Sequence, residues 1–222
     1  MAETWGSSVP DAIHIHEDDW GMRSLYPIAA EPEVERDLAE SIAASEKKLH
    51  PSGFGWTAIH MIAEPSVDYR ELNLLLADAA EKLSAIMPRV KRFAATIGAH
   101  IGTLEKDPYG SYENDAWCFG FDAKCFIKLE PEGDFVKGIW YDFTSSDPQA
   151  EQAMRHAFDV VNGLVPSLLV DYHQDAQGPL GDPEFLDHYF AEHRERRIAV
   201  AKAVEEYRQS SEPKPWWKRL FS

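Results

Sequence analysis

Residues 13–20 hold the densest group of potential metal ligands and general bases in the chain. If residues 13–18 form a strand, their side chains alternate between two faces. Ile13 and Ile15 then point toward a core, whereas His14, His16 and Asp18 share the opposite, polar face. Imidazole and carboxylate groups are ligands of zinc and iron. The spacing therefore indicates a candidate metal site.

Two other interpretations of this segment stay open. The polar face could be the solvated side of an edge strand. Alternatively, Glu17, Asp18, Asp19 and Trp20 could form an acidic contact patch for a protein partner.

The His-x-His-x-Asp spacing partly resembles metal motifs of metallo-β-lactamase-like hydrolases and amidohydrolases, and residues 18–21 resemble a motif of carbohydrate deacetylases. These families need further ligands, earlier strands or a strand–helix repeat, for which we find no counterpart. The sequence also contains no Gly-x-Ser-x-Gly elbow and no glycine-rich phosphate loop with lysine. The catalytic residues of an enzyme therefore stay unassigned.

The two cysteines, Cys118 and Cys125, are too few for a disulfide framework and wrongly spaced for a zinc site. They lie among aromatic residues, and a separation of seven places them on opposite faces of a sheet. We expect buried, reduced and unreactive thiols, which are typical of the cytoplasm.

The chain has 222 residues, with 22 Lys and Arg against 38 Asp and Glu, and a net charge of −16. A nucleic-acid ligand is not expected, because binding to phosphates needs clustered basic residues. An acidic surface suits a basic protein partner, and it also favours solubility. Residues 1–10 lack the pattern of a signal peptide, and no stretch reaches the roughly 20 apolar residues of a spanning helix. We expect a cytoplasmic protein.

The hydrophobic pattern predicts an α+β fold, in which an antiparallel sheet (a meander) is covered by helices in a single domain over 12–209. Residues 1–11 are expected to be a flexible leader. The predicted strands are 12–17, 56–63, 117–121, 125–129 and 135–143, with 168–172 either a strand or a helical turn. The predicted helices are 31–49, 69–98 with a kink or break at Pro88, 148–164 and 183–208, whereas 22–30 and 173–181 are expected to be irregular.

Residues 210–222 are expected to be a linker and a cationic-aromatic tail, ending in Trp216-Trp217-Lys218-Arg219-Leu220-Phe221-Ser222. Such an element could contact a partner, a membrane interface or the acidic body of the chain.

The last quarter of the chain resembles a known class of proteins. Residues 169–172, residues 181–189 and the ending at Phe221 resemble small uncharacterised bacterial proteins of the toxin-immunity type. This resemblance implies an acidic α+β protein that binds and blocks a toxin, and it assigns no catalytic residue.

We therefore expect a non-enzymatic, cofactor-free protein that binds a partner, such as a basic toxin, through Glu17, Asp18, Asp19 and Trp20. The alternative is a metal-dependent hydrolase with zinc or iron at His14, His16 and Asp18. A third hypothesis is a scaffold protein held by its C-terminal tail. The sequence does not predict the oligomeric state.

Overall fold

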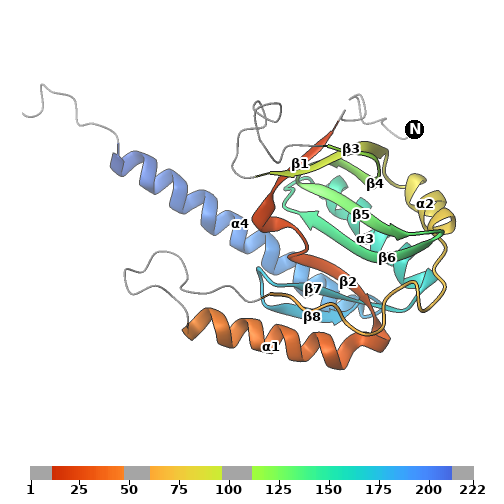
Figure 1. Cartoon of the computed structure of the whole chain (residues 1–222). Coiled ribbons are helices and arrows are strands. Elements are labelled where there is room, and N and C mark those ends of the chain that lie inside the picture. Colours follow the sequence, from red (N-terminus) through yellow and green to blue (C-terminus); the bar gives the residue numbers. More distant parts are fainter. Residues whose placement is uncertain (1–11, 48–60, 97–111, 212–222) are drawn as a thin grey trace, which may run out of the picture.

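The computed structural model of the chain describes residues 12–47, 61–96 and 112–211 (Figure 1). The strands of these residues form one eight-stranded sheet with the order β1-β3-β4-β5-β6-β2-β7-β8. The strands are β1 Ile13–His16, β2 Arg23–Pro27, β3 Arg89–Thr96, β4 Glu113–Asp122, β5 Cys125–Glu132, β6 Phe135–Phe143, β7 Ser167–Asp171 and β8 Ala176–Pro179. The helices are α1 Glu31–Lys47, α2 Leu76–Ser84, α3 Pro148–Leu164 and α4 Pro183–Ser211, with two 3₁₀ turns, η1 Glu17–Asp19 and η2 Ile28–Ala30.

The predicted α+β class is confirmed, but the prediction of a purely antiparallel sheet is wrong. Strands β1 and β3 pair in parallel, with Ile13 opposite Phe93 and Ile15 opposite Ala95. Parallel neighbours need a long crossover connection, and here β2, α1 and α2 lie between the two strands in the chain. The other pairs between named strands are antiparallel.

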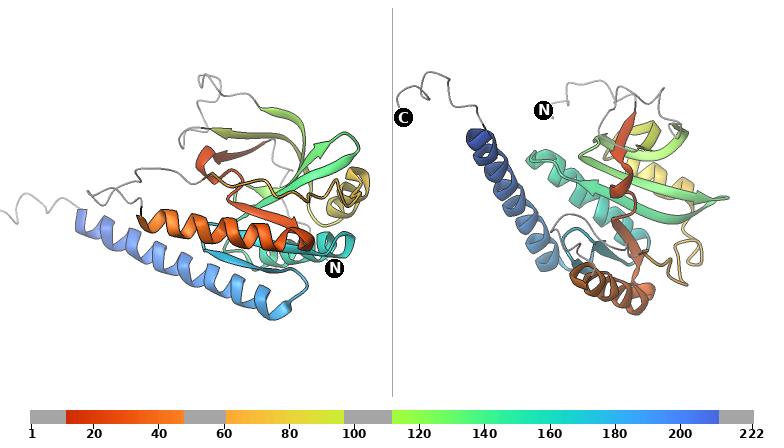
Figure 2. Two further views of the ribbon diagram at one scale, coloured as in Figure 1. Left: turned by 60° about the horizontal axis from the view of Figure 1, so that its bottom comes forward. Right: turned by 60° about the vertical axis from the view of Figure 1, so that its left-hand side comes forward.

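Helices cover both faces of the sheet (Figures 1 and 2). Helices α2, α3 and α4 pack on one face, where Leu83, Phe158 and Phe190 join Tyr141 and Phe143 of β6 in the main core. Helix α1 packs on the opposite face at the β2–β7 end. Its apolar residues Val34 and Leu38 contact a cluster that includes Leu168, Val170 and Tyr172.

A third cluster lies at the β1–β3 end of the sheet. It contains Ile13, Phe93, Cys118, Phe126 and Trp140, together with Ile15, Val90 and Ala116. Cys125 belongs instead to the core beneath α2, α3 and α4. The two cysteines thus lie on opposite faces, as the sequence predicted, and both are buried free thiols.

The elements with strong local signals form as predicted. Strands β4, β5 and β6 form the meander, and Gly133 takes a φ of +62° in the last turn, which suits glycine. Helix α3 begins with Pro148 after an Asp147 cap, whose carboxylate accepts a hydrogen bond from the Gln149 amide at 2.9 Å.

The predicted long helix over 69–98 is wrong. In the described part of this range, residues 69–96, only α2 is helical. The chain does break near Pro88, as one of the two predicted outcomes there, but it continues as strand β3 and not as a helix. Proline disfavours helical backbone at the residue before it. The apolar spacing of Val90 and Phe93 imitates a helix because the β3–β4 register shifts between Val90 and Arg92, so that both residues join one cluster.

Three other predictions need correction. Residues 22–30 contain the central strand β2, which is buried on both sides and so lacks polar alternation. Residues 61–63 are not a strand, and the rest of the predicted strand 56–63 lies outside the described residues. Residues 173–181 contain β8, and 168–172 is covered by strand β7 up to Asp171.

The predicted leader 1–11 lies outside the described residues. The predicted linker and tail began at residue 210, but α4 continues to Ser211, and residues 212–222 lie outside the described residues. Among the helices that are described, none has both the length and the apolar character to cross a membrane.

Two glycines give opposite predictions for stability. A Cβ atom on Gly120 would lie 2.4 Å from Phe126 Cβ and 2.5 Å from the Cys125 carbonyl oxygen, whereas a Cβ atom on Gly163 in α3 would meet no described atom within 4 Å. Gly120→Ala should lower the free energy of unfolding by about 1–3 kcal/mol through overpacking. Gly163→Ala should raise it by about 0.5–1 kcal/mol, because alanine favours the helix. Urea unfolding of both variants tests this, and equal midpoints would contradict the packing described.

Candidate functional site

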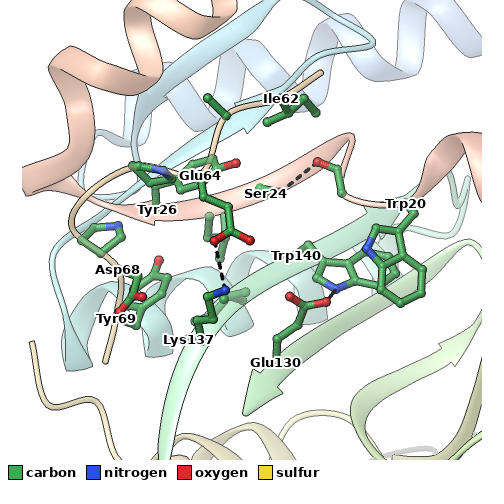
Figure 3. A pocket seen from close by; sticks show the side chains of 17 residues that line it. Trp20, Ser24, Tyr26, Ile62, Glu64, Asp68, Tyr69, Glu130, Lys137 and Trp140 are labelled. Carbon is green, nitrogen blue, oxygen red and sulfur yellow. Dashed lines mark hydrogen bonds and ion pairs between the residues drawn. The ribbon is translucent and has the colours of Figure 1, made fainter. Parts of the chain in front are cut away.

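A groove crosses the face of the sheet that also carries α1 (Figure 3). It has a volume of about 270 Å³ and lies between β2, residues 62–69 and β6. Trp20 and Trp140 lie together at one end, and the Glu64–Lys137 ion pair, 3.0 Å between Oε2 and Nζ, lies between segments of its wall. The lining therefore combines aromatic rings with charged side chains.

Trp20 is a fixed but exposed aromatic side chain at the end of this groove. Trp20 is 45% exposed to solvent. The ring centroid lies 5.1 Å from that of Trp140 and 5.8 Å from that of Phe93. The Lys128 ammonium lies 5.6 Å from the indole centroid, within the range of a cation–π contact. These contacts hold the indole in place without covering it.

The residues beneath Trp20 are themselves paired. Lys128 is 3% exposed, and its ammonium lies 3.0 Å from a Glu113 carboxylate oxygen. The Trp140 indole N–H donates to Glu130 Oε1 at 3.1 Å. The platform that carries Trp20 is thus satisfied in both packing and hydrogen bonding.

The acidic residues predicted to contact a partner lie on η1, directly before Trp20. Glu17 and Asp18 are exposed, and Asp19 is half-buried. Asp19 Oδ1 lies 3.4 Å from His173 Nε2, and the Asp18 amide donates to His16 Nδ1 at 3.2 Å. The four predicted residues, Glu17 to Trp20, therefore form one continuous surface segment, which we call the Trp20 surface.

The predicted alternation of the N-terminal strand is confirmed for β1. Ile13 and Ile15 are buried in the core, whereas His14 and His16 line a polar cavity of about 410 Å³. Strand β1 ends at His16, however, so Asp18 does not continue that strand face. The Asp18 carboxylate turns back on its own segment, 3.3 Å from His16 Nδ1.

The same polar cavity brings together residues that are distant in the sequence. Asp19, Arg23, Asp142 and His173 line it beside the two histidines of β1. The His14 Nε2 atom is buried and has no hydrogen-bond partner among the described residues. Burial, together with the nearby Arg92 charge, lowers the pKa of His14.

Arg23 is the centre of a buried network between the sheet and α4. Its Nε donates to Asp171 Oδ2 at 3.0 Å, and its Nη1 donates to Asp142 Oδ1 at 2.8 Å. The Tyr189 hydroxyl donates to the same Asp171 oxygen at 2.9 Å and lies 3.0 Å from the Tyr141 hydroxyl. One cation is thus shared by two carboxylates that are almost fully removed from water, and the cluster carries one net negative charge when both acids are ionised.

The network changes the acidity of its members. Burial raises the pKa of the Asp142 carboxyl to about 6, although the Arg23 charge opposes this rise. Burial alone would lower the pKa of Arg23, but the carboxylates of Asp171 and Asp142 raise it above its ordinary value. Burial also lowers the pKa of His173. Such perturbed groups beside a cavity are typical of functional sites and also of structural ion pairs.

Arg23, Asp142 and Asp171 were not predicted as site residues from the sequence. Arg23 is separated from its two partners by 148 and 119 residues, so no local spacing connects them. A signal was nevertheless present, because Asp142 and Asp171 each adjoin strongly apolar strand residues. Carboxylates are rarely buried unless they are paired, so such positions indicate a buried partner.

Neither cysteine is a candidate nucleophile. Burial raises the pKa of the Cys125 thiol to about 12 and that of Cys118 further still. The thiolate is the reactive form of cysteine, so both side chains are expected to be inert.

Among residues 12–47, 61–96 and 112–211, no group of three or more His, Cys, Asp and Glu side chains is arranged to hold a metal ion.

No known protein family, curated protein or solved structure matches this sequence.

Proposed function

We propose that this chain is a non-enzymatic protein-binding protein of the immunity type, which inhibits a bacterial toxin by binding it through the Trp20 surface. The observation that carries this proposal is the exposed indole of Trp20 on its aromatic platform. Tryptophan is enriched among the residues that dominate binding energy, and a side chain already held in place loses little entropy on binding.

The charge around Trp20 supports a basic partner. Glu17, Asp18 and Asp19 precede the indole, and the whole chain carries a net charge of −16. Complementary charge accelerates the encounter of two proteins and selects their orientation. The groove beside Trp20 offers about 270 Å³ in which a partner side chain could be buried.

The toxin-immunity part of the proposal depends on the resemblance of the last quarter of the sequence. That resemblance implies an acidic cytoplasmic protein that binds and blocks a toxin. The net charge and the α+β class of this chain agree with the resemblance. Proteins with many unrelated functions share that fold class, so the class alone does not identify the function.

Removing the three acidic charges should slow association. In the variant E17Q/D18N/D19N, we expect the association rate constant with the basic protein partner, once it is isolated by affinity capture, to fall about tenfold at low ionic strength and to depend less on salt. Stopped-flow or surface-binding kinetics at two salt concentrations measure this.

A matched control separates the Trp20 surface from net charge. The variant D78N/E81Q/D159N removes the same charge from exposed positions on α2 and α3, on the other face of the sheet. Its association rate should stay close to that of the unmodified protein. If the two triple variants have the same association rate constant and the same salt dependence, the Trp20 surface is not the binding site.

A metal-dependent hydrolase is a second candidate, favoured by one observation. His14 and His16 line the same cavity as Asp19 and His173, and the buried His14 Nε2 has no partner among the described residues. Zinc or iron there would need a ligand set beyond the predicted His14, His16 and Asp18. Elemental analysis of the purified protein tests this: near one metal per chain, lost in H14A/H16A, would favour the hydrolase, and no metal would contradict it.

A further inference from the structure

A further cavity, of about 340 Å³, lies between the end of β6, the turn after β7 and the middle of α4. It shares Arg23, Thr144 and His173 with the polar cavity of β1. The side chains that bear on its chemistry are Arg23, His173, Gln174, His193, Arg196 and Arg197. None of the described residues that line it is Asp or Glu, although the chain as a whole is strongly acidic.

Two buried polar atoms in this lining lack partners. His193 is 5% exposed and Gln174 is 7% exposed. Among the described residues, neither His193 Nδ1 nor Gln174 Oε1 has a hydrogen-bond partner. Buried polar groups in folded proteins are nearly always hydrogen-bonded, so these two side chains call for a partner, which a water molecule or a ligand can supply. Rotation of the Gln174 amide by 180° presents its NH₂ group instead of its oxygen.

The arginines on α4 supply positive charge at the mouth of the cavity. Arg197 has no carboxylate partner among the described residues, whereas the neighbouring Arg194 pairs with Glu151 at 2.6 Å. Arg196 donates to the carbonyl oxygen of His173 at 3.3 Å, and its Nη2 lies 4.0 Å from Glu192. The guanidinium group has several donors in one plane and therefore suits oxyanions with several acceptor oxygens.

We infer that this cavity binds a phosphate group, with Arg197 as its principal charged partner and with His193 and Gln174 as neutral hydrogen-bonding partners. Arg23 stays paired with Asp142 and Asp171, so the positive charge available to the phosphate comes from Arg196 and Arg197. This inference is independent of the proposed toxin binding, which uses the Trp20 surface.

His193 provides the readout for this inference. Burial and the Arg23 charge lower its pKa to about 4, with Arg197 adding to the effect. A bound anion would offset the arginine charges and raise the pKa of this imidazole. The signals of the His193 ring can be assigned by comparison with H193Q.

The test is a titration of the ¹⁵N-labelled full chain with inorganic phosphate and with methyl phosphate at constant ionic strength, followed by the histidine ring signals. We expect saturable binding at one site per chain, with a rise in the pKa of His193. The variant R197Q should weaken the affinity about tenfold or more, since it removes a hydrogen bond between charged groups. The variant R194Q, which removes a neighbouring charge outside the cavity, should bind as the unmodified protein does.

Three results would overturn the inference. The first is a His193 signal that does not change saturably with either phosphate. The second is an equal loss of affinity in R197Q and R194Q, which would indicate a general charge effect. The third is tighter binding of acetate than of phosphate under the same conditions, which would identify a carboxylate site. Far-UV circular dichroism of both variants ensures that a loss of affinity is not a loss of folding.

Discussion

Replacing Arg23 by alanine should lower the free energy of unfolding by about 3–5 kcal/mol, the range found when one partner of a buried ion pair is removed. Asp171 is fully buried and Asp142 is 8% exposed, so neither carboxylate could recover its hydration after the guanidinium is lost. A loss of this size is a large fraction of the total free energy of unfolding of a small protein. Urea unfolding followed by tryptophan fluorescence measures the change.

The pH dependence of this loss has a definite sign. In the intact protein, burial already raises the pKa of Asp142 to about 6, above its unfolded value. Without Arg23, this pKa should rise further, so that the folded state binds a proton more tightly than the unfolded state does. Asp142 of the unmodified protein is itself protonated below about pH 6, so the stability of Arg23→Ala relative to the unmodified protein should recover as the pH falls toward 6 and change little below it.

Two controls accompany this variant. Arg70 forms ion pairs with Glu132, Glu71 and Asp68 at the surface, so Arg70→Ala should unfold at nearly the same urea concentration as the unmodified protein. Replacing the whole cluster, as R23M/D142N/D171N, should be less harmful than removing the cation alone. Equal effects of Arg23→Ala and Arg70→Ala would mean that the network contributes little to stability.

Replacing Trp20 by alanine should weaken binding of the captured partner by about 2–4 kcal/mol, roughly thirtyfold to a thousandfold in Kd. The indole is exposed at the groove and would lose both its contact area and its position next to Trp140 and Lys128. Trp20→Phe should retain part of the affinity, because a smaller aromatic ring can rest on the same platform. Isothermal titration calorimetry of each variant with the partner measures these effects.

Ile198 provides the matched control for Trp20. This apolar residue of α4 is 70% exposed, lies far along the chain from η1 and does not line the groove. Ile198→Ala should leave the affinity unchanged. A Trp20→Ala variant that is folded and binds normally would remove Trp20 from the interface.

The parts of the fold that follow from the sequence have local causes. Asp147 and Pro148 determine the start of α3 through capping and backbone geometry. The alternation in β4–β6 and the turn at Gly133 similarly predict the meander. The prediction for β1 also held for Ile13, His14, Ile15 and His16, because alternation is a property of the strand alone.

The parts that the sequence did not predict depend on contacts between distant segments. The register shift at Val90 gives β3 a helical apolar spacing, and only its pairing with β4 reveals a strand. Strand β2 is buried from both sides, so its residues carry no alternation. For the candidate site, Glu17 to Trp20 are adjacent in the sequence and could be proposed from it as one segment. Arg23 and its partners Asp142 and Asp171 come together only in the folded sheet.

Binding of a protein partner through the Trp20 surface can be measured by quantitative affinity capture from a lysate of the source cells. Three baits are compared: the unmodified chain, E17Q/D18N/D19N, and D78N/E81Q/D159N. We predict a basic protein that is captured by the unmodified chain and by the α2–α3 control, and that is depleted with the variant of the Trp20 surface. Capture of the same proteins in the same amounts by all three baits would contradict binding through the Trp20 surface.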